Sequence, residues 1–333
     1  MNPPAPTGKW HAFLTTARLP NVPSVISNVW MGVALGALVW DLEGGRSLFL
    51  KALAMAVSGV LLYFGGNFLN DWQDREWDEK HRPERALPQK LFSPLNYLLN
   101  ALRFLGLGVV CSAVGGPLCI ATAVVIVIAI FIYTKWHKVA VWPVIPMGLC
   151  RALLPVLGFL AMKPVGPQLT TISLQNIGAS AADTPLSQAI FIGIHALGLF
   201  GWIAGLTLNA RYESIGDPPA GARFFARLLL AMPLILIGGR WLLWYPIPAV
   251  IGMVPLLYWM WLTLAKKRNI GQRVSMLLAG IPLVEWVAAM PLAIALRHPS
   301  QSLLGDPLTG LTLLLPPTAF LVARRLQRRI AAT

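Results

Sequence analysis

The sequence predicts an all-α integral membrane protein with nine transmembrane helices and a tenth candidate, with two acidic motifs on the cytoplasmic side of the bundle. Its 333 residues are 56% hydrophobic and only 12% charged, whereas a soluble domain carries roughly 25% charged residues. A chain with so few charges cannot cover a water-exposed surface of this size. The net charge of +14 could point to a nucleic-acid partner, but the long apolar runs exclude one.

Apolar runs of transmembrane length follow one another along the chain. A helix needs about 20 mainly apolar residues to cross the hydrocarbon core. This length predicts spans at 24–42, 48–70, 95–114, 117–134, 142–162, 188–209, 224–243, 246–264 and 275–296. The stretch 303–323 is also long enough, although Pro316 and Pro317 weaken it as a helix.

Basic residues orient these spans. With the N-terminus in the cytoplasm, twenty of the 27 Lys and Arg fall in inside segments and five in outside segments. This bias agrees with the positive-inside rule. The sequence therefore predicts a cytoplasmic N-terminal tail at 1–23, one polytopic membrane domain at 24–323 and a basic C-terminal tail at 324–333. We expect a bacterial-type inner membrane as its location.

Acidic residues are concentrated directly after the second span, where six of the 13 lie within 71–84. Asn70, Asp74 and Asp78 are spaced i, i+4, i+8, so they share one helix face. Mg²⁺ typically takes one or two carboxylates and completes its shell with water and phosphate oxygens. Two carboxylates this close also repel each other unless a cation lies between them. The face predicts a Mg²⁺ site for a phosphate-bearing substrate; a solvated loop is the alternative.

The same spacing recurs after the sixth span, in Asn209, Glu213 and Asp217. The second and sixth spans run in the same direction, and parallel internal repeats are a known membrane architecture. Two such helices facing each other could hold two Mg²⁺ with a diphosphate between them.

A diphosphate also needs fixed positive charge. Arg82 and Arg85 follow the first acidic face, and Lys135 lies at the start of the next cytoplasmic loop. Arginine offers phosphate a planar fork, whereas lysine acts as a point charge. For Lys138 we expect a role in topology alone.

Two charges lie inside predicted spans. Arg151 lies too deep in the fifth span to be a topology anchor, and such a charge usually faces an interior cavity. We expect it to line the pocket. Glu285, in the ninth span, has no partner nearby in the sequence, and its simplest role is to pair with an arginine.

The first acidic segment resembles a known motif. It reads Asn70-Asp71-Trp-Gln-Asp74-Arg-Glu-Trp-Asp78 and continues as Arg82-Pro-Glu-Arg85-Ala-Leu-Pro88. It is similar to the first Asp-rich motif of UbiA-type intramembrane prenyltransferases. Weaker similarity covers the run from Arg18 to Asn28 and the Tyr133-Thr-Lys135 segment. The likeness extends from about residue 15 to 296 and implies a nine-helix fold.

This resemblance implies Mg²⁺-dependent transfer of a prenyl group from an isoprenyl diphosphate to a lipophilic, often aromatic, acceptor. By position, it assigns the first metal site to Asn70, Asp74 and Asp78. It implies that Arg85 and Lys135 stabilise the leaving diphosphate and that a second metal site contains Glu213 and Asp217. The other substrate-binding candidates are Asp71, Arg82, Arg151, Asn209 and Arg211.

The transfer chemistry adds one aromatic candidate. An aromatic face can stabilise an allylic cation by about 0.5–2 kcal/mol. Of the aromatic residues near the acidic helices, we retain Tyr212, which adjoins Glu213.

The second acidic motif departs from the family pattern, which there reads Asp-x-x-x-Asp. This chain has Asn209, Glu213 and Asp217, and Pro218-Pro219 follows at once. A degenerate motif leaves open a non-catalytic isoprenoid-binding scaffold. A polytopic transporter is also open, although it would place its charges near the bilayer midplane.

Overall fold

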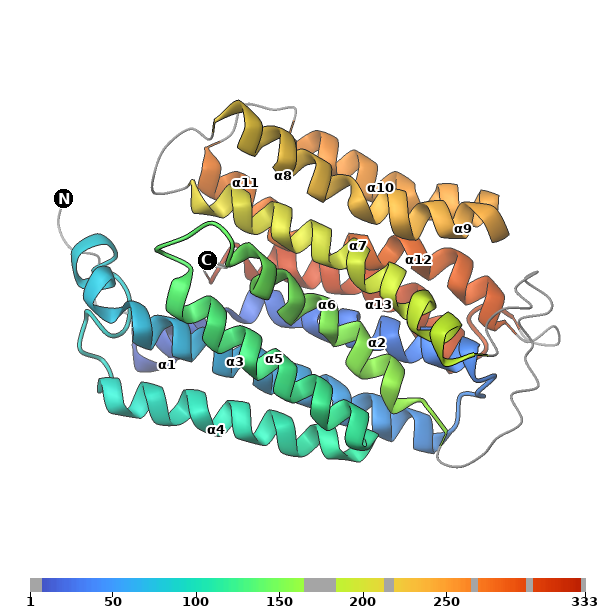
Figure 1. The fold of residues 1–333 in the computed structure, drawn as a ribbon, viewed down its shortest axis with the longest axis horizontal. Helices are drawn as coiled ribbons and strands as arrows, with labels where there is room; N and C mark the ends of the chain where they lie inside the picture. Colours follow the sequence, from blue (N-terminus) through green and yellow to red (C-terminus); the bar gives the residue numbers. More distant parts are fainter. Residues whose placement is uncertain (1–7, 165–183, 213–218, 265–268, 298–301, 331–333) are drawn as a thin grey trace.

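The computed structural model of this chain describes residues 8–164, 184–212, 219–264, 269–297 and 302–330. Within these ranges the chain contains helices and no strand, and ten helices are long and apolar enough to cross a membrane. The predicted all-α class is therefore confirmed. The helices run roughly along one axis, so that their ends gather at two opposite ends of the bundle (Figure 1).

The ten helices follow the predicted spans in order. They are α2 (Val22–Val39), α3 (Arg46–His81), α4 (Pro94–Ser112), α5 (Pro117–Trp136), α6 (Val144–Ala161), α7 (Pro185–Arg211), α8 (Ala220–Met232) continued through a π-helical segment (Pro233–Gly238) into α9 (Gly239–Trp244), α10 (Pro246–Leu264), α11 (Ile270–Ala279) followed by α12 (Ile281–Leu296), and α13 (Pro307–Leu326). The tenth candidate is thus a helix of membrane length. It continues through Pro316 and Pro317, as neighbouring helices in a membrane bundle allow.

The N-terminal segment is not only a tail. A short helix, α1 (Lys9–Thr16), precedes α2. Its Phe13 ring lies 5.2 Å from the Phe68 ring of α3, and its Thr16 hydroxyl is hydrogen-bonded to the Tyr97 hydroxyl of α4 at 2.8 Å. These contacts place the residues before α2 against the end of α3.

The tight turn between α4 and α5 depends on one glycine. Gly116 has φ +94°, a backbone region that glycine enters without steric cost. Pro117 follows as the first residue of α5, where its missing N–H costs nothing. The chain therefore reverses here, and the two adjacent predicted spans stay separate.

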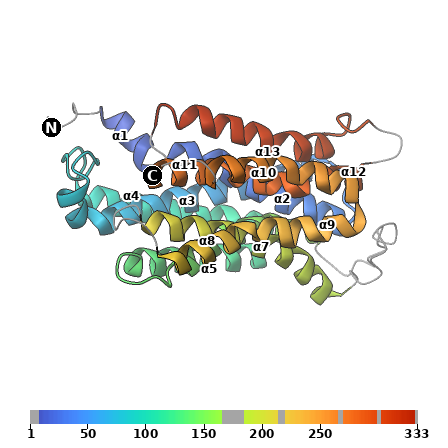
Figure 2. The ribbon, with the colours of Figure 1, turned by 90° about the horizontal axis from the view of Figure 1, so that it is seen from above.

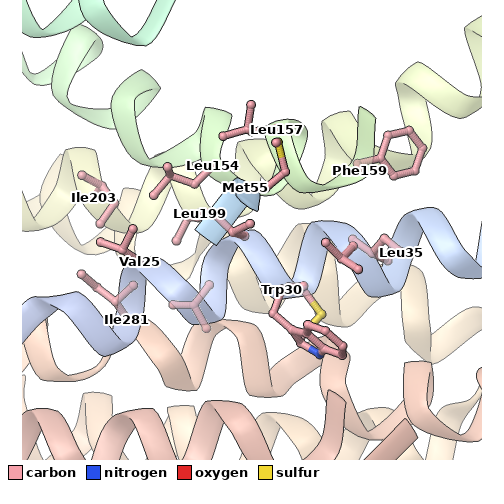
Figure 3. Close-up of a cluster of buried hydrophobic side chains, with 14 of the residues drawn as sticks. Val25, Trp30, Leu35, Met55, Leu154, Leu157, Phe159, Leu199, Ile203 and Ile281 are labelled. Carbon is pink, nitrogen blue, oxygen red and sulfur yellow. The ribbon is translucent and has the colours of Figure 1, made fainter. Parts of the chain in front are cut away.

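The core is centred on α2, which packs against α3, α6, α12 and α13. Figure 3 shows Val25, Trp30 and Leu35 of α2 among side chains from α3, α6, α7 and α12. A Cβ added to Gly32 would lie 1.8 Å from the Pro155 carbonyl oxygen, and one added to Gly158 would lie 2.1 Å from that of Val29. Glycine is required at both positions because it lets the α2 and α6 backbones touch.

The long helix α3 positions the first acidic motif. Its 36 residues give a length of about 54 Å, whereas the hydrocarbon core is only about 30 Å thick. The helix α1, the C-terminal end of α13 and the segment that follows α3 lie at the same end of the bundle (Figures 1 and 2). The last turns of α3, which carry Asn70 to Asp78, therefore project at this end.

Candidate functional site

One face of α3 lines a cavity of about 530 Å³. From this face come Gly59, Tyr63, Asn70, Asp74 and Asp78, which cover about 28 Å of helix at ~1.5 Å per residue. The acidic side chains are buried, and Asp78 is only 1% exposed. The predicted shared face of Asn70, Asp74 and Asp78 is thus present, and it faces this cavity.

Each of the two acids on this face is paired with cationic groups. The Arg85 guanidinium donates to Asp78 Oδ2 at 2.8 Å and to Asp71 Oδ1 at 3.1 Å. Lys138 Nζ lies 3.2 Å from Asp74 Oδ1, and His137 Nε2 lies 3.3 Å from Asp74 Oδ2. The pairing offsets the cost of placing several carboxylates together in a buried site.

Two of these cations have shifted pKa values. Burial alone would lower the pKa of Arg85, but the carboxylates of Asp71 and Asp78 outweigh it and hold the pKa above its usual value. Burial lowers the pKa of Lys138, and the opposing effect of Asp74 does not fully offset it. Both results show that this end of the cavity is partly withdrawn from water.

Two oxygen atoms on this face have no hydrogen-bond partner among the described residues. They are Asn70 Oδ1 and Asp78 Oδ1, and both are buried. A buried polar atom without a partner is costly and calls for a ligand or an ion. Carboxylate and amide oxygens are the donors that Mg²⁺ prefers. In the part of the chain that the structure describes, no three His, Cys, Asp or Glu residues form a metal cluster. The oxygens of Asn70, Asp74 and Asp78 are donors of the kind that Mg²⁺ takes together with phosphate oxygens.

The cavity changes character along its length. Near the acids its wall carries the guanidinium-bearing residues Arg82, Arg85 and Arg211. Further along α3 it becomes apolar, with Leu62, Ile126, Ile130, Leu154 and Ile203 in the wall. A charged head group therefore fits at one end and a hydrocarbon chain at the other.

A comparison with known families identifies this architecture. The model of the UbiA prenyltransferase family matches residues 29–281. The chain belongs to this family. Its cavity, with the first Asp-rich motif on one side, is accordingly the candidate active site of a UbiA protein.

Individual relatives are more distant. A digeranylgeranylglyceryl phosphate synthase from Methanopyrus kandleri is 32% identical over 101 residues, which is 30% of this chain and 37% of that relative's length. A solved structure described for digeranylgeranylglyceryl phosphate synthase superposes with a TM-score of 0.56 at 18% identity, covering 86% of this chain and 98% of the other. A UbiA homologue from Archaeoglobus fulgidus bound to DMAPP and Mg²⁺ has a TM-score of 0.46 at 13% identity, covering 96% and 99%.

Most of the first-motif candidates of this UbiA chain lie at the cavity. The lining includes Asn70, Asp74, Asp78, Arg82, Arg85, Arg151 and Arg211. Asp71 lies outside the lining and pairs with Arg85 and, at 3.8 Å, with Arg18. It is therefore linked to the cavity wall through these two arginine side chains.

Lys135 lies outside the cavity lining, contrary to the expectation from the UbiA resemblance. It is exposed, and its Nζ lies 4.7 Å from the centroid of the Trp136 ring. The face of α5 that lines the cavity contains Ile130, Tyr133 and Thr134 and continues to His137, so residue 135 falls off that face. The loop cation that contacts Asp74 is Lys138, for which the sequence had suggested only a role in topology.

Of the predicted site residues at the end of α7, Arg211 lines the cavity, whereas Asn209 and Tyr212 do not. Arg211 donates to the carbonyls of His137, at 3.0 Å, and Ala140, and so ties α7 to the loop after α5. Asn209 donates to the Gly205 carbonyl of its own helix, and both it and Tyr212 lie outside the cavity lining. Glu213 and Asp217 of the second acidic motif lie outside the described residues.

Sequence reasoning missed Arg18 and His137 as contributors to the cavity, and among the aromatic residues near the acidic helices it retained Tyr212 in place of Tyr63. Tyr63 lies seven residues before Asn70 and lines the cavity, as the helical spacing extended backwards would have indicated. Arg18 lines the cavity with a left-handed backbone, φ 47°, which costs a non-glycine residue about 1–2 kcal/mol. Its carbonyl accepts from the Tyr63 hydroxyl at 3.4 Å. No local pattern marked His137, because its approach to Asp74 depends on how the chain leaves α5.

Proposed function

We propose that this protein transfers a prenyl group from an isoprenyl diphosphate to a lipophilic acceptor, with Mg²⁺, at the cytoplasmic side of a bacterial-type inner membrane. The observation that carries the proposal is the cavity, which joins the Asn70, Asp74 and Asp78 face to an apolar wall. A prenyl diphosphate has the same two parts, a charged head and a hydrocarbon tail.

The head group would bind where the buried oxygens need a partner. Asn70, Asp74 and Asp78 would hold Mg²⁺, which when bound neutralises charge on the diphosphate oxygens and eases C–O cleavage. Arg82, Arg85 and Lys138 would then contact the phosphates, since all three line this end of the cavity. We assign Glu213 and Asp217 to a second Mg²⁺ site, in line with their place in the second motif.

The tail would lie against the apolar wall. Departure of the diphosphate leaves an allylic cation, which must meet the acceptor before it meets water. A cavity enclosed by packed helices limits access of water. The rings of Tyr63 and Tyr133 line it, and an aromatic face stabilises a cation by ~0.5–2 kcal/mol.

Arg151 suits the acceptor better than the donor. It is buried in α6 and lines the cavity beside Tyr63, with its guanidinium carbon 5.1 Å from the ring centroid. A hydrocarbon tail offers a guanidinium no partner, and other cations serve the diphosphate. We therefore assign Arg151 to an oxyanion on the acceptor, such as the carboxylate of an aromatic acid or the phosphate of a glyceryl phosphate lipid. The relative named digeranylgeranylglyceryl phosphate synthase makes the second class a direct candidate.

The test is a transfer assay with the detergent-purified protein. Radiolabelled geranylgeranyl diphosphate is supplied with Mg²⁺ and either 4-hydroxybenzoate or geranylgeranylglyceryl phosphate, and the lipid product is separated and counted. The proposal predicts a labelled product with one acceptor and none in EDTA. Donor binding without transfer to either acceptor would favour the isoprenoid-binding scaffold, and absence of donor binding in a folded protein would contradict the proposal.

A further inference from the structure

A chain of buried hydrogen bonds runs from the cavity wall into the interior of the bundle. Arg151 Nη1 donates to Asn28 Oδ1 at 3.1 Å and to Ser24 Oγ at 3.0 Å. Asn28 Nδ2 donates to Glu285 Oε1 at 2.5 Å, and His195 Nε2 lies 2.7 Å from Glu285 Oε2. The chain links α2, α6, α7 and α12 through side chains that the sequence places up to 257 positions apart.

Arg151 is the end of this chain that reaches the cavity. It is in the lining, whereas Asn28, His195 and Glu285 are 0% exposed and lie behind it. Glu285 follows Ile281, a lining residue of α12, by one helical turn. Glu285 itself is absent from the lining and 0% exposed, yet it is two hydrogen bonds away from Arg151, which faces the cavity.

Electrostatics explains why a carboxylate lies here. A buried guanidinium is costly unless a negative charge compensates it. Glu285 lies on the other side of the Asn28 amide from Arg151, with one hydrogen bond on each side of that amide. The expected pairing of Glu285 with an arginine thus occurs through an intermediary and not by direct contact.

The donor and acceptor roles of the side chains fix the direction of the hydrogen bonds that run from Arg151 through Asn28 to Glu285. An ionised carboxylate can only accept, and a guanidinium can only donate. The Asn28 amide must therefore turn its NH₂ group toward Glu285 and its oxygen toward Arg151. An uncharged amide at position 285 could still accept from Asn28 through its oxygen, but it would carry no negative charge to compensate Arg151.

We propose that Glu285 is a positioning residue for Arg151: acting through Asn28 and held by His195, it supplies the counter-charge and fixes the guanidinium in the cavity wall beside Tyr63. The inference rests on the proposed function in one respect, the assignment of Arg151 to the acceptor oxyanion. Its consequence is that a change at Glu285, which no substrate touches, weakens acceptor binding and leaves donor binding intact.

The decisive comparison is between Glu285→Gln and the double variant N28D/E285Q. In the double variant the negative charge moves to position 28, where the new carboxylate would accept from Arg151 and from the amide introduced at position 285. The oxygen of that amide would still accept from His195. The charge count and the number of hydrogen bonds are both restored. If Glu285 served only to fill space, moving the negative charge to position 28 would restore neither acceptor binding nor stability.

Both variants are assayed for acceptor KM and donor KM with geranylgeranyl diphosphate, Mg²⁺ and the acceptor that the wild type uses, and for thermal stability without substrate. Glu285→Gln should raise acceptor KM by roughly tenfold or more, as expected for loss of an interaction with a charged group, and should lower the melting temperature. Donor KM should stay within about twofold. N28D/E285Q should return acceptor KM to within roughly threefold of wild type and recover the stability, because a compensated charge no longer incurs the penalty of isolation.

A matched control separates positioning from packing. Thr312→Val removes another fully buried polar group, which accepts a hydrogen bond from Trp30 and is not hydrogen-bonded to any member of the chain from Arg151 to Glu285. It should lower stability and leave acceptor KM unchanged.

Three results would overturn the inference: wild-type acceptor KM in Glu285→Gln, a parallel rise of donor and acceptor KM, or a double variant that is no better than the single one. If Glu285→Gln does not fold, the double variant carries the test alone and must fold with a near-wild-type acceptor KM. Failure of the proposed function is recognised separately, because then the wild type itself transfers nothing, while the recovery of stability by charge exchange can still be measured.

Discussion

The carboxylates of Asp71, Asp74 and Asp78 at the end of α3 and the carboxylate of Glu285 are all buried, but their surroundings differ. Both oxygens of Glu285 are hydrogen-bonded to neutral or weakly basic side chains, and Glu285 is not part of the cavity lining. Asp78 and Asn70 each keep one buried oxygen without a partner among the described residues, and both line the cavity. The α3 set therefore has oxygens available to a ligand in the cavity, and we call it the open set. The Glu285 carboxylate has both oxygens bonded, and His195 Nδ1, the buried atom of its network without a partner among the described residues, lies outside the cavity lining; we call this the closed set.

The largest loss of donor binding is expected from a substitution in the open set on α3, which consists of Asn70, Asp74 and Asp78. Asp74→Ala should abolish Mg²⁺-dependent binding of prenyl diphosphate and reduce transfer by at least ~10³-fold, the scale for lost charge stabilisation in a transition state. The folded state should persist, because the change also removes a buried charge. Binding is read from thermal stabilisation by geranylgeranyl diphosphate.

Glu79→Ala is the matched control for that loss. Glu79 lies on the same helix but is exposed and outside the cavity lining, so its removal should leave donor binding unchanged. Equal losses in both variants would mean that general negative charge on α3, and not the cavity-facing set, binds the donor.

The contrast between the two sets is sharpened by neutralising one acid from each. Asp78→Asn should weaken donor binding strongly but leave the melting temperature of the free protein equal or higher, because it removes a charge that burial disfavours and also relieves repulsion with Asp71 and Asp74, which together outweigh the attraction of Arg85. Glu285→Gln should show the reverse, with a lower melting temperature and intact donor binding. If both variants behaved alike, the distinction between an open and a closed set would be wrong.

A smaller effect is expected from the lysines after α5. Lys138→Ala should weaken donor binding by roughly tenfold, the scale of one interaction with a charged group, since Lys138 contacts Asp74 in the cavity. Lys135→Ala should change it by less than about twofold. Isothermal binding of geranylgeranyl diphosphate with Mg²⁺ measures both, and a larger loss for Lys135 would restore it as the phosphate ligand.

The smallest effect is expected at Tyr63. Its hydroxyl accepts from Asn21 at 3.1 Å and donates to the Arg18 carbonyl, so Tyr63→Phe should lower the free energy of unfolding by about 1 kcal/mol. The ring beside Arg151 remains, and acceptor KM should change by less than about twofold. A tenfold rise in KM would show that the hydroxyl itself binds the acceptor.

The sequence predicted the structure best where the periodicity of a helix determines which residues share a face. The spacing of Asn70, Asp74 and Asp78 required one shared face, and the depth of Arg151 in an apolar span required a cavity or a partner. Both expectations depend only on local geometry and on the cost of burying charge. The ten membrane-length helices could also be predicted from the sequence, because the length of an apolar run is a local property. Only Pro316 and Pro317 made the last helix uncertain.

The missing parts depend on tertiary geometry. Lys138 and Lys135 are three residues apart, and the exit of the chain from α5 decides which of them approaches Asp74. The chain from Arg151 to Glu285 joins residues of four helices, so no single segment contains a signal for it. The partners of Glu285 are the Asn28 amide and the His195 ring, which lie on other helices and which spacing along the sequence could not have identified.

The central claim is that the α3 face binds a prenyl diphosphate with Mg²⁺, and the most direct measurement is the melting temperature of the detergent-purified protein. It is recorded with geranyl, farnesyl and geranylgeranyl diphosphate, each in Mg²⁺ and in EDTA. The account predicts stabilisation of several degrees that requires Mg²⁺ and varies with chain length, because a ligand that binds the native state stabilises it by mass action. The same melting temperature in every condition, in a protein shown to be folded, would contradict it.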